Sequence, residues 1–340
     1  PDILEEIADT VRNGPGRRRH IHLILENDQN QVGYLRRSAS GLCREFSAQV
    51  NDDFHHACHV QLTGEHHGYY LDYQKNPLAL VARCLTEGFA YQGEPSSFRG
   101  NIARGEESGH LPLSAFVNFL QNHDQIGNRA FGERLGHLVS EPALRLAVAL
   151  LLLAPSPPLL FMGEEYAANT PFCYFCDFSR ELARQVAEGR RREFADFFPP
   201  QHQQAIPDPN ALESFTGSCL NWQETAGEKG RSWLELYREL LYLRQQIIVP
   251  RLAGLQGGNA WSCTIGAAGL HVRWILGDGA LLEVFANFSN QPLSGLLMDH
   301  EALLYALPAL GAKEALDQKL AGWGIAWFLR GKEGTTDGKA

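Results

Sequence analysis

Three short apolar runs in this sequence end in groups of polar side chains that could carry out chemistry. The runs and the groups that follow them are Ile21 to Leu25 with Glu26-Asn27-Asp28, Phe116 to Leu120 with Gln121-Asn122-His123-Asp124, and Leu159 to Met162 with Gly163-Glu164-Glu165. Apolar runs of this length are typical of buried parallel strands. We therefore expect the polar groups to gather where the strands end.

Glu26 and Asp124 have the chemistry needed to cleave a glycosidic bond. That reaction usually uses one carboxylic acid to protonate the leaving oxygen and one carboxylate to attack or stabilise the sugar cation. The apolar strand before Glu26 would bury its carboxyl and raise its pKa, which would keep it protonated near neutrality. His123 could bind a sugar hydroxyl beside Asp124. A salt-bridged glutamate at a strand end, and a simple turn at Asn122, stay open as alternatives.

Helical segments are predicted between these strands, at 52–65, 77–91 and 141–153. Alternating strands and helices are typical of a parallel α/β domain, and an α/β barrel fits this pattern best. Barrel enzymes place their active sites at the carboxyl ends of the strands. The polar groups described above would occupy that position.

The second half of the chain changes character after a predicted amphipathic helix at 233–248. Short alternating strands follow, such as 270–275 and 281–288, separated by glycines. A chain of 340 residues exceeds the size of one typical core, which favours a large and a small domain. We predict part of a barrel in 1–249, a small β-sandwich-like domain in 250–330, and a disordered tail in 331–340.

Composition excludes several classes of partner. The formal charge of −9, with 39 acidic and 30 basic side chains, argues against nucleic acid. The longest apolar stretch, 143–161, contains Arg145 and three prolines, so we expect no membrane span. Residues 1–11 lack the features of a secretory signal, and seven cysteines without framework spacing favour reduced thiols. These observations predict a cytoplasmic protein.

Three further patterns suggest binding sites, but simpler interpretations are preferred for each. His55 and His59 share a helical face at the spacing of metal ligands, yet no H-E-x-x-H pattern is present, and Asn51 before them suits a helix N-cap. Cys173 and Cys176 form a lone C-x-x-C without a second pair. The arginines at 190–192 lie among glutamates and suggest an ion-paired surface. No metal site is predicted.

Several segments of the chain resemble malto-oligosyltrehalose trehalohydrolases, a family of retaining glycosidases in the α-amylase superfamily. The segments 22–28 and 116–129 resemble the fifth-strand and seventh-strand regions of that family. The run Asn51 to His56, followed by Leu62 to Glu65, is similar to one that separates the family from amylases and branching enzymes. Segments 161–165 and 189–194 extend the resemblance, which reaches from residue 1 to about residue 330. It implies the C-terminal half of a (β/α)8 barrel followed by a small antiparallel β domain.

The resemblance also implies roles for individual residues. Glu26 would be the general acid/base, Asp124 the transition-state stabiliser, and His123 its sugar-binding neighbour. We predict further substrate contacts from polar side chains of the same motifs, which are Asn122, Gln125, Asp28, Asp52, Asp53 and His56. The implied substrate is an α-glucan, malto-oligosyltrehalose, cleaved at the α-1,4 bond next to its terminal trehalose, and no cofactor is implied.

One part of the family pattern has no match in the chain. The family's third carboxylate, the aspartate nucleophile of the fourth strand, would precede Pro1. We therefore expect the chain alone to be inactive, and to fold poorly because the edges of an open barrel lack hydrogen-bond partners. Two rival functions stay open: a glucan branching enzyme or related α-glucan transferase, and a non-catalytic α-glucan-binding remnant. Trehalose release, new branch points, or glycogen binding without turnover would distinguish the three.

Overall fold

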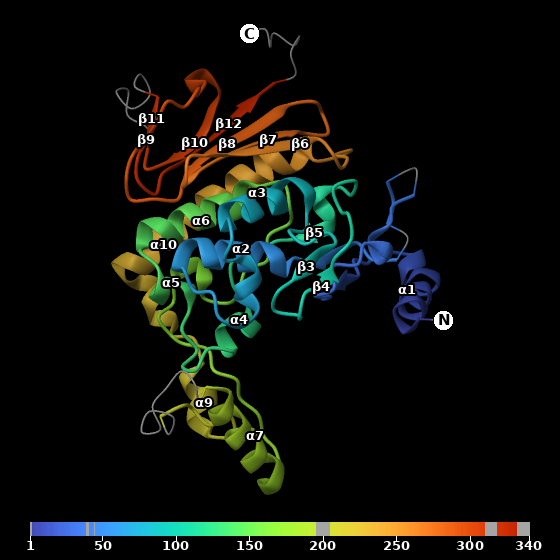
Figure 1. Ribbon diagram of the computed structural model, residues 1–340, viewed down its shortest axis with the longest axis vertical. Coiled ribbons are helices and arrows are strands. Elements are labelled where there is room, and N and C mark those ends of the chain that lie inside the picture. The colour runs from blue at the N-terminus through green and yellow to red at the C-terminus, as the bar shows by residue number, and fades with distance from the viewer. Residues whose placement is uncertain (1, 39–40, 44, 195–204, 310–317, 332–340) are drawn as a thin grey trace. The chain divides into compact units, whose positions relative to one another are not determined.

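The computed structural model describes residues 2–38, 41–43, 45–194, 205–309 and 318–331 (Figure 1). The fold divides into two compact units. Unit 1 comprises Pro1–Leu120, Arg145–Leu159 and Leu240–Ala340, and unit 2 comprises Gln121–Leu144 and Leu160–Glu239. The units alternate along the chain, so neither corresponds to one continuous segment.

A small parallel sheet forms the centre of unit 1. Its strands are β1 (Ile24–Leu25), β2 (Ala48–Val50) and β5 (Phe116–Val117), hydrogen-bonded in that order and all parallel. Asn118 continues the pattern through a parallel bridge to Pro158. Neighbours in the sheet are also neighbours in chain order, as in a (β/α)8 barrel. The predicted α/β fold of part of a barrel is therefore confirmed.

Helices separate these strands along the chain. They are α2 (Asp52–Thr63), α3 (Pro77–Glu87) and α6 (Glu141–Leu153), which runs from unit 2 into unit 1. Two glycines end α2 and α3 earlier than predicted. Gly64 takes a left-handed conformation, and Gly88, also at positive φ, leaves room for the Phe116 ring, which would lie 2.3 Å from a Cβ at that position.

The rest of the barrel part of unit 1 consists of short elements. An amphipathic helix, α1 (Ile3–Asn13), begins at Asp2, whose side chain accepts a hydrogen bond from the Leu4 amide at 3.0 Å. A hairpin of β3 (Glu94–Ser96) and β4 (Ile102–Arg104) follows α3. Its last residue, Arg104, points into the interior and is 5% exposed.

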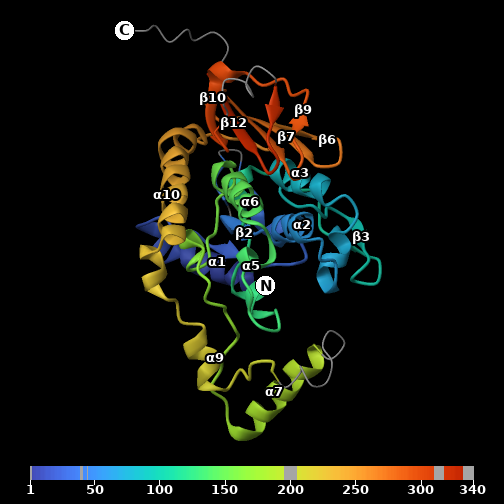
Figure 2. The same ribbon diagram turned by 90° about the vertical axis from the view of Figure 1, so that its left-hand side faces the viewer.

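An antiparallel sheet in residues 260–330 completes unit 1. Five strands pair in the order β10 (Leu303–Leu307), β12 (Ile325–Arg330), β8 (Leu281–Asn287), β7 (Gly269–Ile275) and β6 (Ala260–Ile265), beside a ribbon of β9 (Leu293–Ser294) and β11 (Lys319–Leu320). Both views show α3 against this sheet (Figures 1 and 2). There the indole N–H of Trp274 donates to the Leu85 carbonyl at 2.8 Å. The small β domain is thus confirmed; all but one residue of the predicted tail lies outside the described residues.

Unit 2 consists mainly of helices and connecting segments. They are α4 (His123–Gly127), α5 (Leu135–Leu138), α7 (Arg180–Glu193), α9 (Leu212–Gly217) and most of α10 (Glu228–Leu243). Asn210, just before α9, donates a hydrogen bond to the Ala183 carbonyl of α7 at 3.3 Å. Within the described ranges, none of the helices has the length and apolar character needed to cross a membrane.

Candidate active site

The predicted site residues fall into two groups, one in each unit. Glu26, Asp28, Asp52, Asp53 and His56 belong to unit 1, and residues 122–125 belong to unit 2. Glu26 directly follows β1, as predicted. Its side chain is exposed, however, and its neighbour Ile24 is 52% exposed. The expected burial of the Glu26 carboxyl by its own strand is therefore wrong, because an apolar run does not show whether both faces of a strand are covered.

Asp28 is held by a basic side chain from the β3–β4 hairpin. Its carboxylate forms an ion pair with Arg99 and accepts a hydrogen bond from Gln29 at 3.0 Å. Partial burial alone would raise the pKa of Asp28, but the hydrogen bond and charge of Arg99 outweigh it, so the pKa lies below its usual value. Asp28 is thus a stable anion on the exposed side of this loop.

Asp52 behaves in the opposite way. It occupies the first turn of α2 and is partly buried. Burial, together with the negative charges of Asp53 and Glu26, raises the pKa of Asp52 to about 7. Asp52 therefore lies within electrostatic range of Glu26. Its own carboxyl is partly protonated near neutral pH.

Asp53 is committed to the interior of unit 1. It has no exposed surface, and its Oδ2 accepts hydrogen bonds at 2.8 Å from the Asn30 side chain and from the amides of Ala90 and Tyr91. Its Oδ1 contacts Arg104 at 2.8 Å and accepts a hydrogen bond from the Tyr73 hydroxyl. No face of this carboxylate is left for a sugar, which corrects the expectation that Asp53 contacts substrate.

The histidines of α2 lie among aromatic rings. His55 bonds the Leu120 carbonyl at 2.6 Å through Nδ1 and the Tyr70 hydroxyl at 2.9 Å through Nε2, and burial lowers its pKa to about 3. His59 pairs with Glu65 at 2.8 Å. Among the residues that the structure describes, no three His, Cys, Asp or Glu side chains are grouped so as to hold a metal ion. Both imidazoles have protein partners of their own.

His56 is the one of these histidines whose Nδ1 is buried without a hydrogen-bond partner among the described residues. Its ring centroid lies 4.8 Å from that of Tyr69 and 5.0 Å from that of Tyr73. Burial lowers the pKa of His56 well below its usual value, so it is a neutral hydrogen-bonding group. Asn51 has the predicted N-cap position, but its side chain bonds Gly88 and Asn118 instead of the helix amides, which corrects that part of the prediction.

In unit 2, Asn122 and Gln125 form the cap of α4. The Asn122 side chain accepts from the Asp124 amide at 2.8 Å, and the Gln125 side chain accepts from the Asn122 amide at 3.0 Å. This reciprocal capping places His123 and Asp124 on the first turn. His123 Nε2 lies 3.4 Å from Asp124 Oδ1, and both side chains are well exposed.

Tyr174 is a residue of this group that the sequence did not indicate. Its hydroxyl donates to Asp124 Oδ1 at 2.6 Å. Arg190 lies over the Tyr174 ring at 5.6 Å and donates to the carbonyls of Gly127 and Arg129. It forms the predicted ion pair, with Glu193 at 3.3 Å, but its side chain is only 11% exposed, so the predicted surface position is wrong. A Cβ at Gly127 would lie 2.5 Å from the Tyr174 ring. The only hint in the sequence was an aromatic pair inside the lone C-x-x-C.

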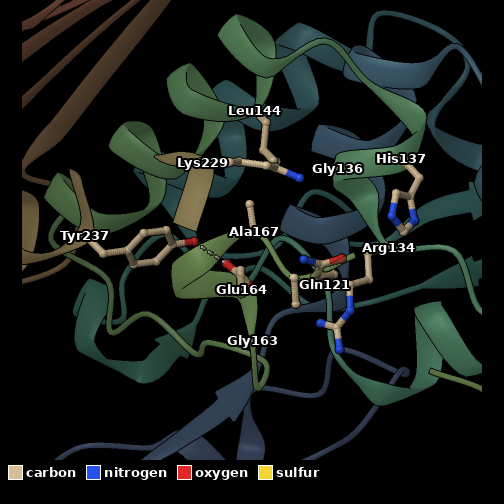
Figure 3. Close-up of a pocket in the computed structure, with 11 residues that line it drawn as sticks. Gln121, Arg134, Gly136, His137, Leu144, Gly163, Glu164, Ala167, Lys229 and Tyr237 are labelled. Carbon is tan, nitrogen blue, oxygen red and sulfur yellow. Dashed lines mark hydrogen bonds between the residues drawn. The ribbon is translucent and has the colours of Figure 1, made fainter. Parts of the chain in front are cut away.

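A small pocket in unit 2 surrounds Glu164, whose carboxyl is almost fully buried (Figure 3). The Tyr237 hydroxyl donates to Glu164 Oε1 at 2.9 Å, and the Phe161 amide donates to Oε2 at 3.3 Å. Burial raises the pKa of Glu164 to about 7 in spite of these hydrogen bonds and of the charge of Arg134. The pocket volume is about 20 Å³, room for roughly one water molecule.

Among known proteins, the chain is similar to several that carry the same name. The chain is 39% identical over 299 residues to the malto-oligosyltrehalose trehalohydrolase of Rhizobium sp. (strain M-11), a match that covers 86% of the chain and 48% of that protein. It is 41% identical over 300 residues to the enzyme of that name from Deinococcus radiodurans, covering 84% and 48%. A family profile described as a domain of unknown function, DUF3459, matches residues 259–327.

A solved structure extends the likeness to three dimensions. A protein of Salmonella typhimurium, provisionally described as an alpha amylase, is 39% identical and superposes with a TM-score of 0.87 over 96% of this chain and 54% of its own. The chain thus spans about half the length of the relatives it matches. For experiments that need the remaining length, we define the joined protein as this chain preceded by the N-terminal part of the Deinococcus radiodurans relative.

We expect Glu164 to give the folded protein a pH-dependent stability. Its pKa is about 7 in the fold against an ordinary value of 4.5, so between these pH values the folded state holds a proton that the unfolded state loses. Stability should therefore fall as pH rises through this window and level off above pH 7. The free energy of unfolding of the joined protein should fall by about 1–3 kcal/mol across this pH window, measured by urea unfolding. Glu164→Gln should remove that fall. Glu165→Gln is the control, and equal pH slopes for parent and Glu164→Gln would contradict the assignment.

Proposed function

Because this chain belongs to the α-amylase family and is related to malto-oligosyltrehalose trehalohydrolases, we propose that it carries two of the catalytic carboxylates of such an enzyme. The reaction is hydrolysis of the α-1,4 bond next to the terminal trehalose of malto-oligosyltrehalose, with retained configuration. The observation that supports this most directly is the similarity to proteins of that name over more than four fifths of the chain. The two carboxylates assigned in the proposal are Glu26, directly after β1, and Asp124, in the first turn of α4.

In this proposal Glu26 protonates the oxygen of the departing trehalose and then takes a proton from water. Its exposed position after β1 leaves the carboxyl accessible to substrate. Asp124 binds hydroxyls of the ring being cleaved, in the subsite on the non-reducing side of the bond. The hydrogen bond from Tyr174 orients Asp124 Oδ1, and His123 adds a further sugar contact. Asp28 and Asp52, beside Glu26, supply polar contacts to the sugars.

The proposal is tested by incubating the joined protein with malto-oligosyltrehalose and, separately, with amylose. We expect trehalose to be released from the first and no new branch points to form in the second. Branch points would instead support the rival transferase function. Binding of glycogen without any turnover would support a glucan-binding protein, and either result would overturn the proposed hydrolysis.

We expect Asp124→Asn to lower turnover by about 100-fold or more while changing substrate affinity much less. The hydrogen bonds that a carboxylate accepts from the sugar hydroxyls strengthen as positive charge develops on the sugar in the transition state, and a neutral amide lacks the negative charge that stabilises it. The measurement is kcat and KM for trehalose release by the joined protein.

Asp177→Asn is the matched control, because Asp177 is an exposed aspartate in the same unit that plays no part in the proposal. Its kinetics should match those of the parent. A variant at Asp124 with weaker binding and normal turnover would contradict a role in the transition state.

A further inference from the structure

The loop that follows Glu26 is fixed by a buried ion pair that the proposed chemistry does not use. Asp53 has no exposed surface and Arg104 is 5% exposed, and their nearest charged atoms, Oδ1 and Nη2, lie 2.8 Å apart. Burying two charges costs several kcal/mol per ion unless further hydrogen bonds satisfy the remaining atoms. Here further hydrogen bonds satisfy those atoms, and two of the bonds lead to the loop at 27–30.

Arg104 uses all three of its guanidinium nitrogens in different directions. Nη2 contacts Asp53, Nη1 donates to the Tyr73 hydroxyl at 2.7 Å, and Nε donates to the backbone carbonyl of Asp28 at 2.8 Å. Asp28 lies two residues after Glu26. A planar fork bound at each nitrogen allows little movement, so the guanidinium clamps the loop backbone close to the proposed proton donor.

Asp53 fixes the same loop from its far side. The Asn30 side chain donates to Asp53 Oδ2 at 2.8 Å, and Asn30 has a left-handed backbone conformation with φ of 53°. One residue before the Asp28 anchor, the Gln49 side chain donates to the Asn27 carbonyl at 2.8 Å. Residues 27, 28 and 30 are thus each tied to a buried side chain, while Leu25 is paired with Gln49 in the sheet. Glu26 lies between two fixed points.

We infer that Asp53 and Arg104 are positioning residues, which hold the loop after Glu26 so that its carboxyl meets the leaving oxygen. This inference rests on the proposed function of Glu26. A proton donor must be held to within about half an ångström to act, and a displacement of about 1 Å can cost roughly 100-fold in rate. The side chain of Glu26 itself is exposed, so the backbone on either side of it is what the protein can fix.

Arg104→Lys tests the inference because lysine keeps the charge beside Asp53 but cannot reach Tyr73 and the Asp28 carbonyl together. In the joined protein we expect kcat for malto-oligosyltrehalose to fall by about 100-fold with KM little changed. An α-glucosyl substrate with a good leaving group, such as α-glucosyl fluoride, needs little help from an acid. The rate of its first step, release of the leaving group, should fall by less than about 5-fold, measured as the burst in the first turnover. A merely structural role would lower both rates equally.

Arg273→Lys is the matched control, since Arg273 pairs with the buried Glu283 in the same unit and far from this loop in sequence. It should leave both rates unchanged. Hydrogen exchange of the joined protein gives a readout that needs no turnover: in Arg104→Lys, amides of 27–32 should exchange faster while those of the antiparallel sheet do not. Equal loss on both substrates, or unchanged exchange in the loop, would overturn the inference. If the unsubstituted joined protein released no trehalose, that result would count against the proposed function and not against the positioning role of Arg104.

Discussion

Glu26→Gln should abolish hydrolysis of malto-oligosyltrehalose by the joined protein while leaving sugar binding nearly intact. Glutamine has almost the same shape but cannot donate a proton, and general acid catalysis contributes about 100-fold to 10,000-fold to such reactions. Departure of an unactivated sugar oxygen depends on that proton. We therefore expect kcat to fall by at least 1,000-fold, measured as trehalose release with kcat and KM separated.

A substrate with a good leaving group makes this experiment specific. Its glycosidic bond breaks without protonation, so the first step should survive in Glu26→Gln, while hydrolysis of the intermediate slows because no base activates water. Glu107→Gln, at an exposed glutamate of the same unit, is the control for a charge change. Unchanged turnover of malto-oligosyltrehalose by Glu26→Gln would remove Glu26 from the mechanism.

Glu26 and Arg104 differ in how much the sequence could show of their roles. The position of Glu26 at the end of an apolar run was visible, because strand and polar group are adjacent in the chain. The partners of Arg104 are Asp28, Asp53 and Tyr73, which lie 31 to 76 positions away in the chain. A pattern within one segment carries no information about such contacts, so the clamp on the loop could only be seen in the fold.

Periodicity predicted helices better than strands in this chain. The helix at 141–153 matches α6 at both ends, whereas 77–91 overshoots α3 because Gly88 ends it. The short strand β2 was not predicted, since it has three residues with the polar Gln49 in the middle. The predicted strand at 159–162 does not form. Pro158, just before it, makes a single bridge to Asn118, and Leu159 donates its amide to the Asn118 carbonyl at 2.8 Å, while Pro157 and Pro158 have no N–H to extend the ladder.

Electrostatics was the least predictable part of the site. Burial was expected at Glu26, yet the carboxyls whose pKa is raised to about 7 are Asp52 and Glu164. Asp52 stands at a helix N-terminus, where a carboxylate is usually stabilised as an anion. Its neighbours Asp53 and Glu26 and its burial reverse that preference. Whether a carboxyl is protonated therefore depends on its burial and on all of its charged neighbours, which a sequence motif does not show.

The 340-residue chain alone should release no trehalose from malto-oligosyltrehalose. In the proposed retaining mechanism a covalent sugar-enzyme intermediate must form, and the family resemblance assigns its nucleophile to none of the 340 residues. Glu26 cannot replace it, because the acid approaches from the side of the leaving group and the attack comes from the opposite face. In a retaining pair the two carboxyls lie about 5 Å apart. Asp124 is committed to sugar hydroxyls in the proposed mechanism.

Open strand edges add a second reason to expect inactivity. The parallel sheet ends at β1 on one side, and β1 pairs only with β2 among the described strands. A closed barrel would give that edge a partner strand. Co-expression with the N-terminal part of the Deinococcus radiodurans relative should therefore restore trehalose release, and serves as the positive control for the assay of the chain alone.

Robust turnover by the chain alone would show that another carboxylate attacks, and the pH dependence would help to identify it. Asp52 is one candidate, but its pKa of about 7 leaves it largely protonated, and a poor nucleophile, below that pH. Attack by Asp52 would make kcat rise as pH increases through about 7 and would be lost in Asp52→Asn. If turnover instead survived in Asp52→Asn and fell in Glu165→Gln, Glu165 in unit 2 would be the attacking group. Loss of turnover in either variant would show that the nucleophile is present in the chain. No trehalose from the chain alone, and trehalose release on co-expression with the N-terminal part, would support a nucleophile outside these residues.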